Sequence, residues 1–267
     1  DGTKSVFAYF IMGRSVNSRN RVFVKTGDGI RTEAFDPAKV ADPSLIIYAP
    51  VRRYGRSIVV TNGNQTDTIC EYLAQGSDME SALEIRTFEP DGPNFTPRIS
   101  GELILGGKFT YKLSLLKSMD EAGSACTRQY FRYAALNGLG HFIHTYVTDG
   151  NPIPTFVGEP ERVSIPNDID ELTKDIWENL NEDNRISLYV SYMILMGIAD
   201  IEHSRGVDLQ QERLMKIWKI FAVCILISSV LLFMPALVVV AAIVAFVAVI
   251  IFLVRFNTTR QLYNALL

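Results

Sequence analysis

The stretch Val59-Val60-Thr61-Asn62-Gly63-Asn64-Gln65-Thr66-Asp67 is the most informative part of this chain, because it predicts where a strand ends and a polar turn begins. Its β-branched residues favour a strand up to Thr61, and the small polar residues that follow end that strand. An Asn-Gly pair tolerates positive φ, so the turn can present several backbone N–H groups as a concave site for a phosphate or a carboxylate. The residues also leave open the alternative of an ordinary turn after a strand.

Outward from this stretch, short β-rich runs alternate with clusters of Gly, Pro, Asn and Asp. The expected strands are Val6–Met12, Arg21–Lys25, Ser44–Ala49, Ser57–Val60, Glu102–Leu105, Phe109–Leu115, Arg128–Leu136 and Phe142–Val147. The expected helices are Asp67–Gln75, Asp78–Thr87 and Asp168–Leu180, each with a polar residue at its start. Because these elements cluster without strict strand-helix alternation, the pattern favours an α+β layered domain over a doubly wound sheet.

Composition excludes some classes of function. The net charge of -3 and the lack of a basic run argue against nucleic acid, which requires clustered Lys and Arg. The three cysteines are far apart and odd in number, which is typical of reduced thiols in the cytosol. On a strand, His141 and His144 would lie on opposite faces, so no metal site is expected. The first thirteen residues lack a secretory pattern, so we expect this part of the protein in the cytoplasm.

The C-terminal part has a different character, with no charged residue from Ile220 to Val254. One straight helix over that run would be about 52 Å long, whereas a bilayer core is about 30 Å thick. Pro235 therefore predicts two transmembrane helices within 216–256, joined as a hairpin. Basic residues on both flanks place both ends on the cytoplasmic side, with the lipid bilayer as a partner. A single kinked span and a buried helix pair are the alternatives.

Four further polar clusters follow β-rich runs, where pockets form. The motifs, in chain order, read GRSxxSRNR at 13–21, TNGxQTDxI at 61–69, ExxxxxxTPRI at 89–99 and TYxxDGNPxPxFxGEP at 145–160, with Tyr48 and Arg52 between the first two. Taken singly, each cluster is typical of a solvated loop. In this order, they resemble the archaeal-type IMP cyclohydrolase family in its bacterial form, over residues of about 5–190.

The resemblance implies a four-layer αββα fold like that of the N-terminal-nucleophile hydrolases. It also implies ring closure of 5-formamidoimidazole-4-carboxamide ribonucleotide (FAICAR) to IMP, with loss of water, in purine biosynthesis. The expected domains are a cyclohydrolase-like domain over 1–192, a connector over 193–215, the two transmembrane helices over 216–256 and a short cytoplasmic tail over 257–267. The hydrophobic tail lies outside the resemblance.

The reaction needs no cofactor, because the enzyme has to fold its substrate, stabilise an oxyanion and move protons. Our candidate catalytic residues are Glu89 as the carboxylate, with Tyr48 and Arg52 on the oxyanion side. Candidate substrate-binding residues are Arg14, Ser15, Arg21, Thr61, Asn62, Gly63, Asp67, Asn94, Thr96 and Arg98. Arginines and backbone amides suit the 5'-phosphate.

Several structural alternatives stay open. Arg98 is equally consistent with a buried ion pair that fixes a loop, and Glu89 with a solvated turn carboxylate. Ser15 and Ser18 have no adjacent histidine, so a hydrolytic triad is not supported. A non-catalytic purine-ribonucleotide-binding module anchored to a membrane is the competing function, and a soluble enzyme fused to an unrelated tail is a third possibility. An oligomer is compatible with the sequence.

Overall fold

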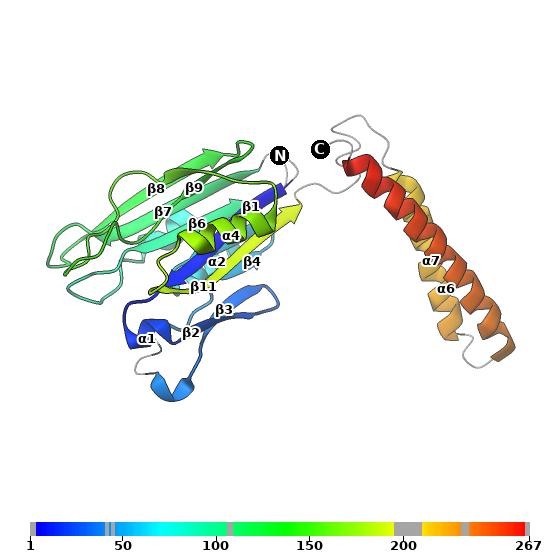
Figure 1. Cartoon of the computed structure of the whole chain (residues 1–267), viewed down its shortest axis with the longest axis horizontal. Coiled ribbons are helices and arrows are strands. Elements are labelled where there is room, and N and C mark those ends of the chain that lie inside the picture. Colours follow the sequence, from blue (N-terminus) through cyan, green and yellow to red (C-terminus); the bar gives the residue numbers. More distant parts are fainter. Residues whose placement is uncertain are drawn as a thin grey trace. The chain divides into compact units, whose positions relative to one another are not determined.

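In this computed structural model, residues 4–40, 43, 46–105, 109–194, 210–230 and 235–264 are described; the side chains of 194, 211, 224–230, 235–242, 245 and 263 are not. The chain divides into two compact units, Asp1–Leu195 and Met196–Leu267, and Figure 1 labels most of their elements. Each unit is described separately.

The first unit is built on a seven-stranded antiparallel sheet with the order β2-β3-β4-β5-β6-β7-β8. Its strands are β2 Arg21–Lys25, β3 Gly29–Ala34, β4 Val51–Tyr54, β5 Ser57–Thr61, β6 Arg98–Ile104, β7 Thr110–Ser118 and β8 Cys126–Ala134. All neighbours are consecutive along the chain, so the sheet is a meander whose connections carry the polar motifs. Two separate antiparallel pairs join β1 Lys4–Met12 to β11 Arg185–Ile194, and β9 Leu139–Phe142 to β10 Glu161–Ser164.

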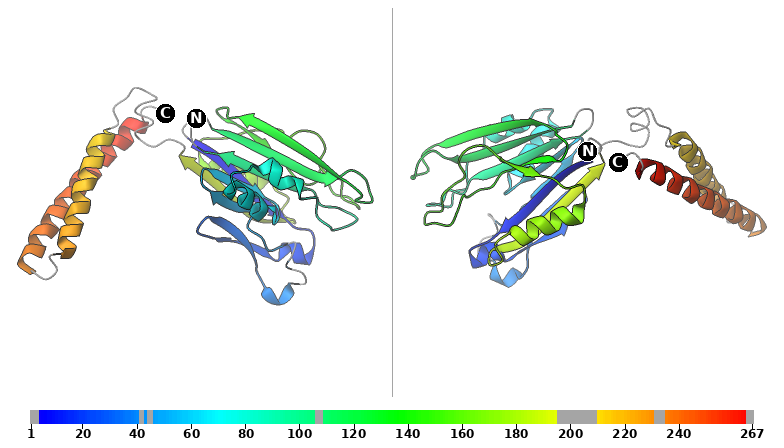
Figure 2. Two further views of the ribbon diagram at one scale, coloured as in Figure 1. Left: turned by 180° about the vertical axis from the view of Figure 1, so that it is seen from behind. Right: turned by 45° about the horizontal axis from the view of Figure 1, so that its top comes forward.

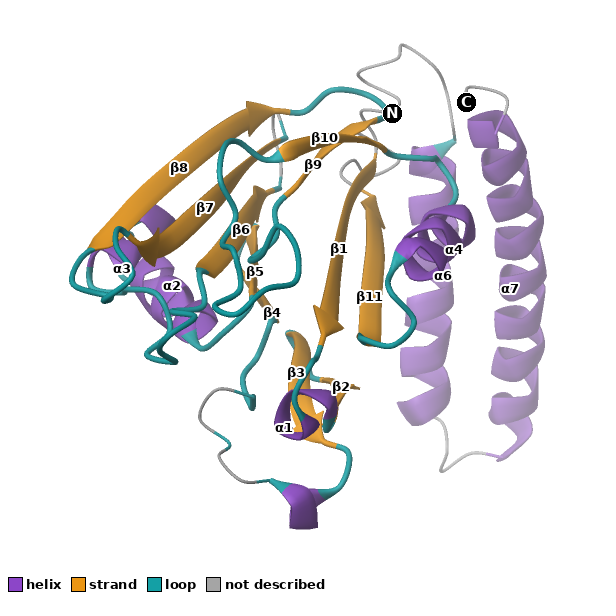
Figure 3. Cartoon of the chain, turned by 60° about the vertical axis from the view of Figure 1, so that its left-hand side comes forward, coloured by secondary structure: helices purple, strands orange, loops and turns teal. Residues whose placement is uncertain are grey.

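Short helices complete the first unit. They are α1 Val16–Arg19, the 3₁₀ turn η1 Pro37–Lys39, α2 Gln65–Ala74, α3 Met79–Glu84 and α4 Ile169–Asn179. Helix α2 contacts β4 and β5, and α4 contacts β11. The left view of Figure 2, which shows the protein from behind, has α2 and α3 over the large sheet, and Figure 3 shows α4 beside the β1–β11 pair.

Apolar residues on the two faces of the large sheet form two separate cores. On the helix side, Val59 and Leu116 pack with Ile69, Met79 and Leu83 of the helices, all of them fully buried. On the other side, a cluster from β3 to β6 packs against residues of β1 and β11; its members are Ile30, Val51, Ile58, Leu103, Phe7, Tyr189 and Met193. The large sheet is thus covered by helices on one face and by a strand pair on the other.

The expected fold class needs correction. The protein is a mixed α/β structure with one large antiparallel sheet, whereas the sequence led us to expect a four-layer αββα arrangement followed by a transmembrane hairpin. The sheet opposite the large one has only two strands, β1 and β11, because the second half of the unit adds just one long strand to it. The remaining two strands, β9 and β10, form a separate antiparallel pair.

Some of the predicted helices and strands agree with the structure and others do not. Asp168 caps α4 by accepting hydrogen bonds from the N–H groups of Asp170 and Glu171, as the predicted helix start requires. The predicted strand over 142–147 is wrong, because β9 ends at Phe142. The strand predicted over 44–49 lies partly outside the described residues, and 46–49 form no strand. Strands β3, β4, β10 and β11 were not predicted at all.

The second unit contains two helices, α6 Gln211–Val230 and α7 Pro235–Asn264, which pack against each other. The rings of Trp218 and Phe252 lie 6.0 Å apart between them. Among the side chains that the structure describes, no helix combines the length and apolar character that a membrane span requires. The expected transmembrane hairpin, and with it the membrane anchor and the bilayer as a partner, is therefore not supported. The predicted connector over 193–215 lies largely outside the described residues.

Candidate functional site

The turn after β5 lies beside the start of β6. Thr61 pairs with Ser100 in the antiparallel register of these strands, so residues 62–64 lie next to Arg98. The N–H of Asn62 donates to the carbonyl of Ile99 at 3.3 Å, and the N–H of Gly63 donates to Thr61 Oγ1 at 3.2 Å. These two amides therefore have partners inside the protein, and the turn does not offer them as the expected anion cradle.

The side chain of Asn62 braces this turn. Its Nδ2 donates to the carbonyl of Pro97 at 2.8 Å, and its Oδ1 accepts the N–H of Ile99 at 2.9 Å and Nε2 of Gln65 at 3.0 Å. Gln65 is fully buried in the first turn of α2 and accepts a hydrogen bond from Nη1 of Arg98 at 2.7 Å. The turn, the helix start and the start of β6 are thus locked together around Arg98.

Gly63 leaves space that Arg98 and Glu89 occupy. A Cβ atom on residue 63 would lie 2.5 Å from Arg98 Nη1, 2.7 Å from Gln65 Oε1 and 3.2 Å from Glu89 Oε1. Real Cβ atoms essentially never come within 3.0 Å of another atom, so the absence of a side chain here allows Arg98 and Gln65 to meet close to Glu89.

Glu89 and Arg98 form a buried pair at this point. Their Oε1 and Nη1 atoms are 3.7 Å apart, and their side chains are only 10% and 9% exposed. Burial raises the pKa of Glu89 to about 7, although the nearby charges of Arg98 and, less strongly, Arg21 oppose that rise. The backbone N–H of Glu89 donates to the carbonyl of Thr96 at 2.9 Å, which fixes the carboxylate's segment. Near neutral pH this carboxyl group can both accept and donate a proton.

Two buried tyrosines and Arg21 form a second set of polar contacts. The hydroxyls of Tyr9 and Tyr48 are 2.8 Å apart, and Nη1 of Arg21 donates to the Tyr48 hydroxyl at 3.5 Å. Burial raises the pKa of both tyrosines, and the charge of Glu89 raises them further. The contacts of Tyr48 join β1, the start of β2 and the segment before β4, and the contacts of Arg98 join the loop before β6 to α2. Because the charge of Glu89 also acts on both tyrosines, we treat these residues as one group, which we call the Glu89 cluster: Tyr9, Arg21, Tyr48, Gln65, Glu89 and Arg98.

Four other predicted site residues lie outside the Glu89 cluster. Ser15 caps α1 in a reciprocal capping box with Ser18. Asn94 accepts the N–H of Ile153 at 3.1 Å, and Thr96 contacts Asp91 and the hydroxyl of Tyr146. Arg14 forms a 2.6 Å ion pair with Asp149. Asn94 and Thr96 thus join the loop before β6 to the loop after β9, and Arg14 joins the segment before α1 to that same loop.

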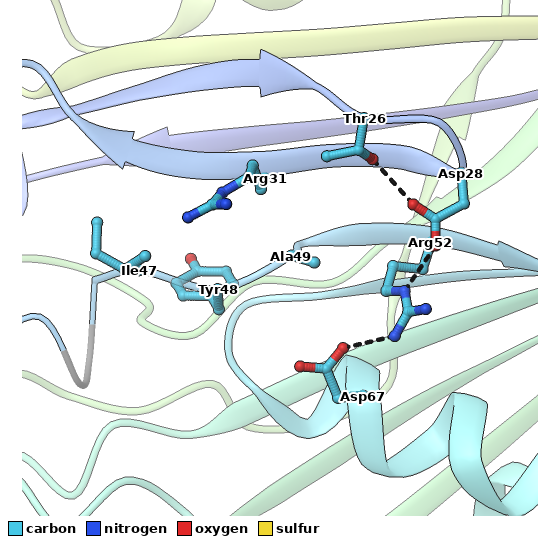
Figure 4. A pocket seen from close by; sticks show the side chains of 8 residues that line it. All are labelled: Thr26, Asp28, Arg31, Ile47, Tyr48, Ala49, Arg52 and Asp67. Atoms are coloured by element: carbon cyan, nitrogen blue, oxygen red, sulfur yellow. Dashed lines mark hydrogen bonds and ion pairs between the residues drawn. The ribbon is translucent and has the colours of Figure 1, made fainter.

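Arg52 and Asp67 belong to a different surface feature. They line an open cavity of about 330 Å³ together with Thr26, Asp28, Arg31, Ile47, Tyr48 and Ala49. Arg52 donates to Asp28 and Asp67 at 2.8 Å each, as the dashed lines in Figure 4 show. Its charge is therefore already balanced by two carboxylates, whereas Tyr48 links this cavity to the Glu89 cluster.

Sequence reasoning missed Tyr9 and Gln65 as members of the cluster. A tyrosine alternating with apolar residues on β1 looks like core, and only its 2.8 Å contact with Tyr48 reveals a polar role. Gln65 carried a usable signal, since it lies within the motif at 61–69 and is a polar residue in the first turn of α2. Among the described residues, no group of three or more His, Cys, Asp or Glu side chains is arranged to hold a metal ion.

Comparison with known proteins bears on the first unit. No curated protein matches the chain closely enough to count as a relative. A family model, by contrast, covers residues 1–194 and leaves the two C-terminal helices outside it, which confirms the resemblance drawn from the ordered motifs. On this match, the chain belongs to the IMP cyclohydrolase-like protein family.

Proposed function

We propose that this protein converts FAICAR to IMP by ring closure with loss of water. Family membership supports an IMP cyclohydrolase-type function in purine biosynthesis; the substrate and the roles of individual residues are our inference. The observation that carries the proposal is the Glu89 cluster, in which a buried carboxyl group with a pKa of about 7 pairs with Arg98 and its charge acts on two buried tyrosines.

The reaction requires one group that moves protons. The carboxamide nitrogen attacks the formyl carbon, so a C–N bond forms, the carbonyl π electrons move to oxygen and the nitrogen loses a proton. The oxyanion takes up that proton and becomes a hydroxyl. The C–O bond then breaks, the former formamido nitrogen loses the second proton, and a C=N bond forms as water leaves. Glu89 suits both transfers because its pKa is about 7, so a neutral solution contains its acid and its base forms. We assign Glu89 to that proton transfer.

The oxyanion that forms on the formyl oxygen needs hydrogen-bond donors in a water-poor site. Arg98 and Tyr48 are buried and carry such donors, and Arg21 contacts the Tyr48 hydroxyl. We assign Arg98 and Tyr48 to the oxyanion. Arg14, which is 40% exposed at the edge of the site, is our choice for the 5'-phosphate. Arg52 receives no role in this scheme, because Asp28 and Asp67 already neutralise it.

The proposal is tested with purified full-length protein and FAICAR, with IMP formation followed by absorbance. We expect turnover by the wild type and a loss on the order of 10²-fold or more in kcat for Glu89→Gln, which keeps the shape but cannot exchange the proton. Glu178→Gln, an exposed change on α4, is the matched control and should leave kcat unchanged.

Two results would contradict the proposal. Equal kcat values for the wild type and Glu89→Gln would remove the assigned role of the carboxylate. Tight binding of IMP by a folded protein that shows no turnover would instead favour the non-catalytic nucleotide-binding module.

A further inference from the structure

The loop after β9 is closed at its base by backbone hydrogen bonds and is exposed at its tip. The N–H of Val147 donates to the carbonyl of Pro154 at 2.9 Å, and the N–H of Phe156 donates to the carbonyl of Thr145 at 3.0 Å. Phe156 is buried at the base of the loop, and Nζ of Lys117 donates to its carbonyl at 3.0 Å. The base of the loop is therefore fixed to β7, whereas Asp149 at its tip is 76% exposed.

This loop is tied to the segment that carries Glu89. The hydroxyl of Tyr146 contacts Thr96 Oγ1, and the same oxygen contacts the carboxylate of Asp91. The carbonyl of Thr96 accepts the backbone N–H of Glu89 at 2.9 Å. A continuous chain of hydrogen bonds thus leads from Tyr146 to the backbone of Glu89.

Arg14 lies against the same loop. Its guanidinium is 5.5 Å from the centroid of the Tyr146 ring, and Nη2 is 2.6 Å from Oδ1 of Asp149. Burial raises the pKa of Tyr146, whereas the charge of the adjacent Arg14 lowers it. Through Tyr146 and Thr96, Arg14 is linked to the segment that carries Glu89. A half-exposed ion pair of this kind is weak, since water screens it, and a doubly charged phosphate can replace a single carboxylate.

We propose that Asp149 occupies Arg14 when no substrate is bound, and that the phosphate of a ribonucleotide displaces Asp149 to reach the guanidinium. Asp149 is then a specificity residue: only a ligand whose anionic group displaces the Asp149 carboxylate gains the contact with Arg14. The cation–π contact with Tyr146 keeps the guanidinium in place during the exchange, because it does not involve the carboxylate. This inference rests on the proposed function for its choice of ligand.

The test compares the binding of IMP and of inosine, which lacks the phosphate, by calorimetry on the full-length protein. Asp149→Asn keeps the size of the side chain and removes its charge, so IMP should bind about two- to fivefold more tightly, the change expected from losing one surface ion pair. Inosine binding should not change. Glu159→Gln, an exposed change of the same charge in the same loop region, is the control and should leave both affinities unchanged.

A second pair of variants isolates the role of Arg14. Because the effect of Asp149 acts through Arg14, the Asp149→Asn change should have no effect on IMP affinity in an Arg14→Gln background. An equal gain in both backgrounds, an equal gain for inosine, or the same gain from Glu159→Gln would each overturn the proposal.

Calorimetry requires no turnover, so the two proposals fail separately. If the predicted binding pattern is found in a protein that does not convert FAICAR, the proposed exchange at Arg14 stands and the proposed enzymatic activity is rejected. Turnover with an unchanged IMP affinity in Asp149→Asn would do the reverse.

Discussion

Gly63→Ala is the sharpest test of the packing around Arg98. The added Cβ would lie 2.5 Å from Arg98 Nη1 and 2.7 Å from Gln65 Oε1, so it enters the space of a hydrogen bond that is itself only 2.7 Å long. Both side chains are buried and held by other contacts, so neither can move aside without losing a partner. The most direct consequence is loss of the Arg98–Gln65 hydrogen bond.

A hydrogen bond to a charged group contributes about 1.5–3 kcal/mol to the free energy of unfolding. For a domain of about 150–250 residues, each kcal/mol corresponds to about 2–4 °C, so we expect Tm to fall by about 3–12 °C. The measurement is thermal unfolding followed by far-UV circular dichroism. Gly27→Ala is the matched control, since a Cβ at that position meets nothing within 4 Å. A Tm for Gly63→Ala within about 1 °C of the control would refute the reasoning, because it would mean that Arg98 and Gln65 do not depend on this glycine.

The remaining predictions concern titration and the edges of the cluster. Because the folded-state pKa of Glu89 is raised to about 7 from 4.5, the wild type should lose stability as pH rises from about 4.5 to 7, by about 3 kcal/mol from this group. Denaturant unfolding at several pH values should show that loss in the wild type and a flatter profile in Glu89→Gln; parallel profiles would contradict it. Tyr9→Phe removes the hydroxyl 2.8 Å from Tyr48 and should lower the free energy of unfolding by about 1 kcal/mol, whereas Tyr54→Phe, an exposed change, should have no effect on it. Arg52→Ala should reduce kcat far less than Glu89→Gln, since Arg52 is held by two carboxylates away from the cluster; comparable losses in steady-state assays would restore its predicted oxyanion role.

Part of the candidate site could be predicted from the sequence because its residues lie in short, ordered motifs. Glu89 and Arg98 occupy the two ends of one motif, and the structure brings them into contact at 3.7 Å. The alternative of a buried ion pair, weighed for Arg98, describes the observed geometry and is compatible with a catalytic role. The sequence marked Asn62 as a site residue but did not predict which groups it contacts. A side-chain amide has both donors and acceptors, and only the neighbouring strands decide which of them are used.

The C-terminal helices show where composition alone was not enough for a correct prediction. An uncharged run from Ile220 to Val254 is a strong composition signal, yet composition alone does not say what covers such a surface. The structure describes two helices that pack on each other there, and it does not support the predicted transmembrane hairpin. The hydrophobic run therefore predicted the two helices, but the transmembrane assignment is not supported among the described residues.

By itself, the sequence determined local features that depend on neighbouring residues: the cap of Asp168 on α4, the extent of β2, and the ordered motifs that identify the family. Only the tertiary structure decided that Tyr9 of the first strand meets Tyr48, and that β1 pairs with β11 at the far end of the same unit. The reason is physical. Capping and strand propensity act over a few residues, whereas a contact between distant segments depends on sheet order and register, which are set by how all the apolar faces are buried together.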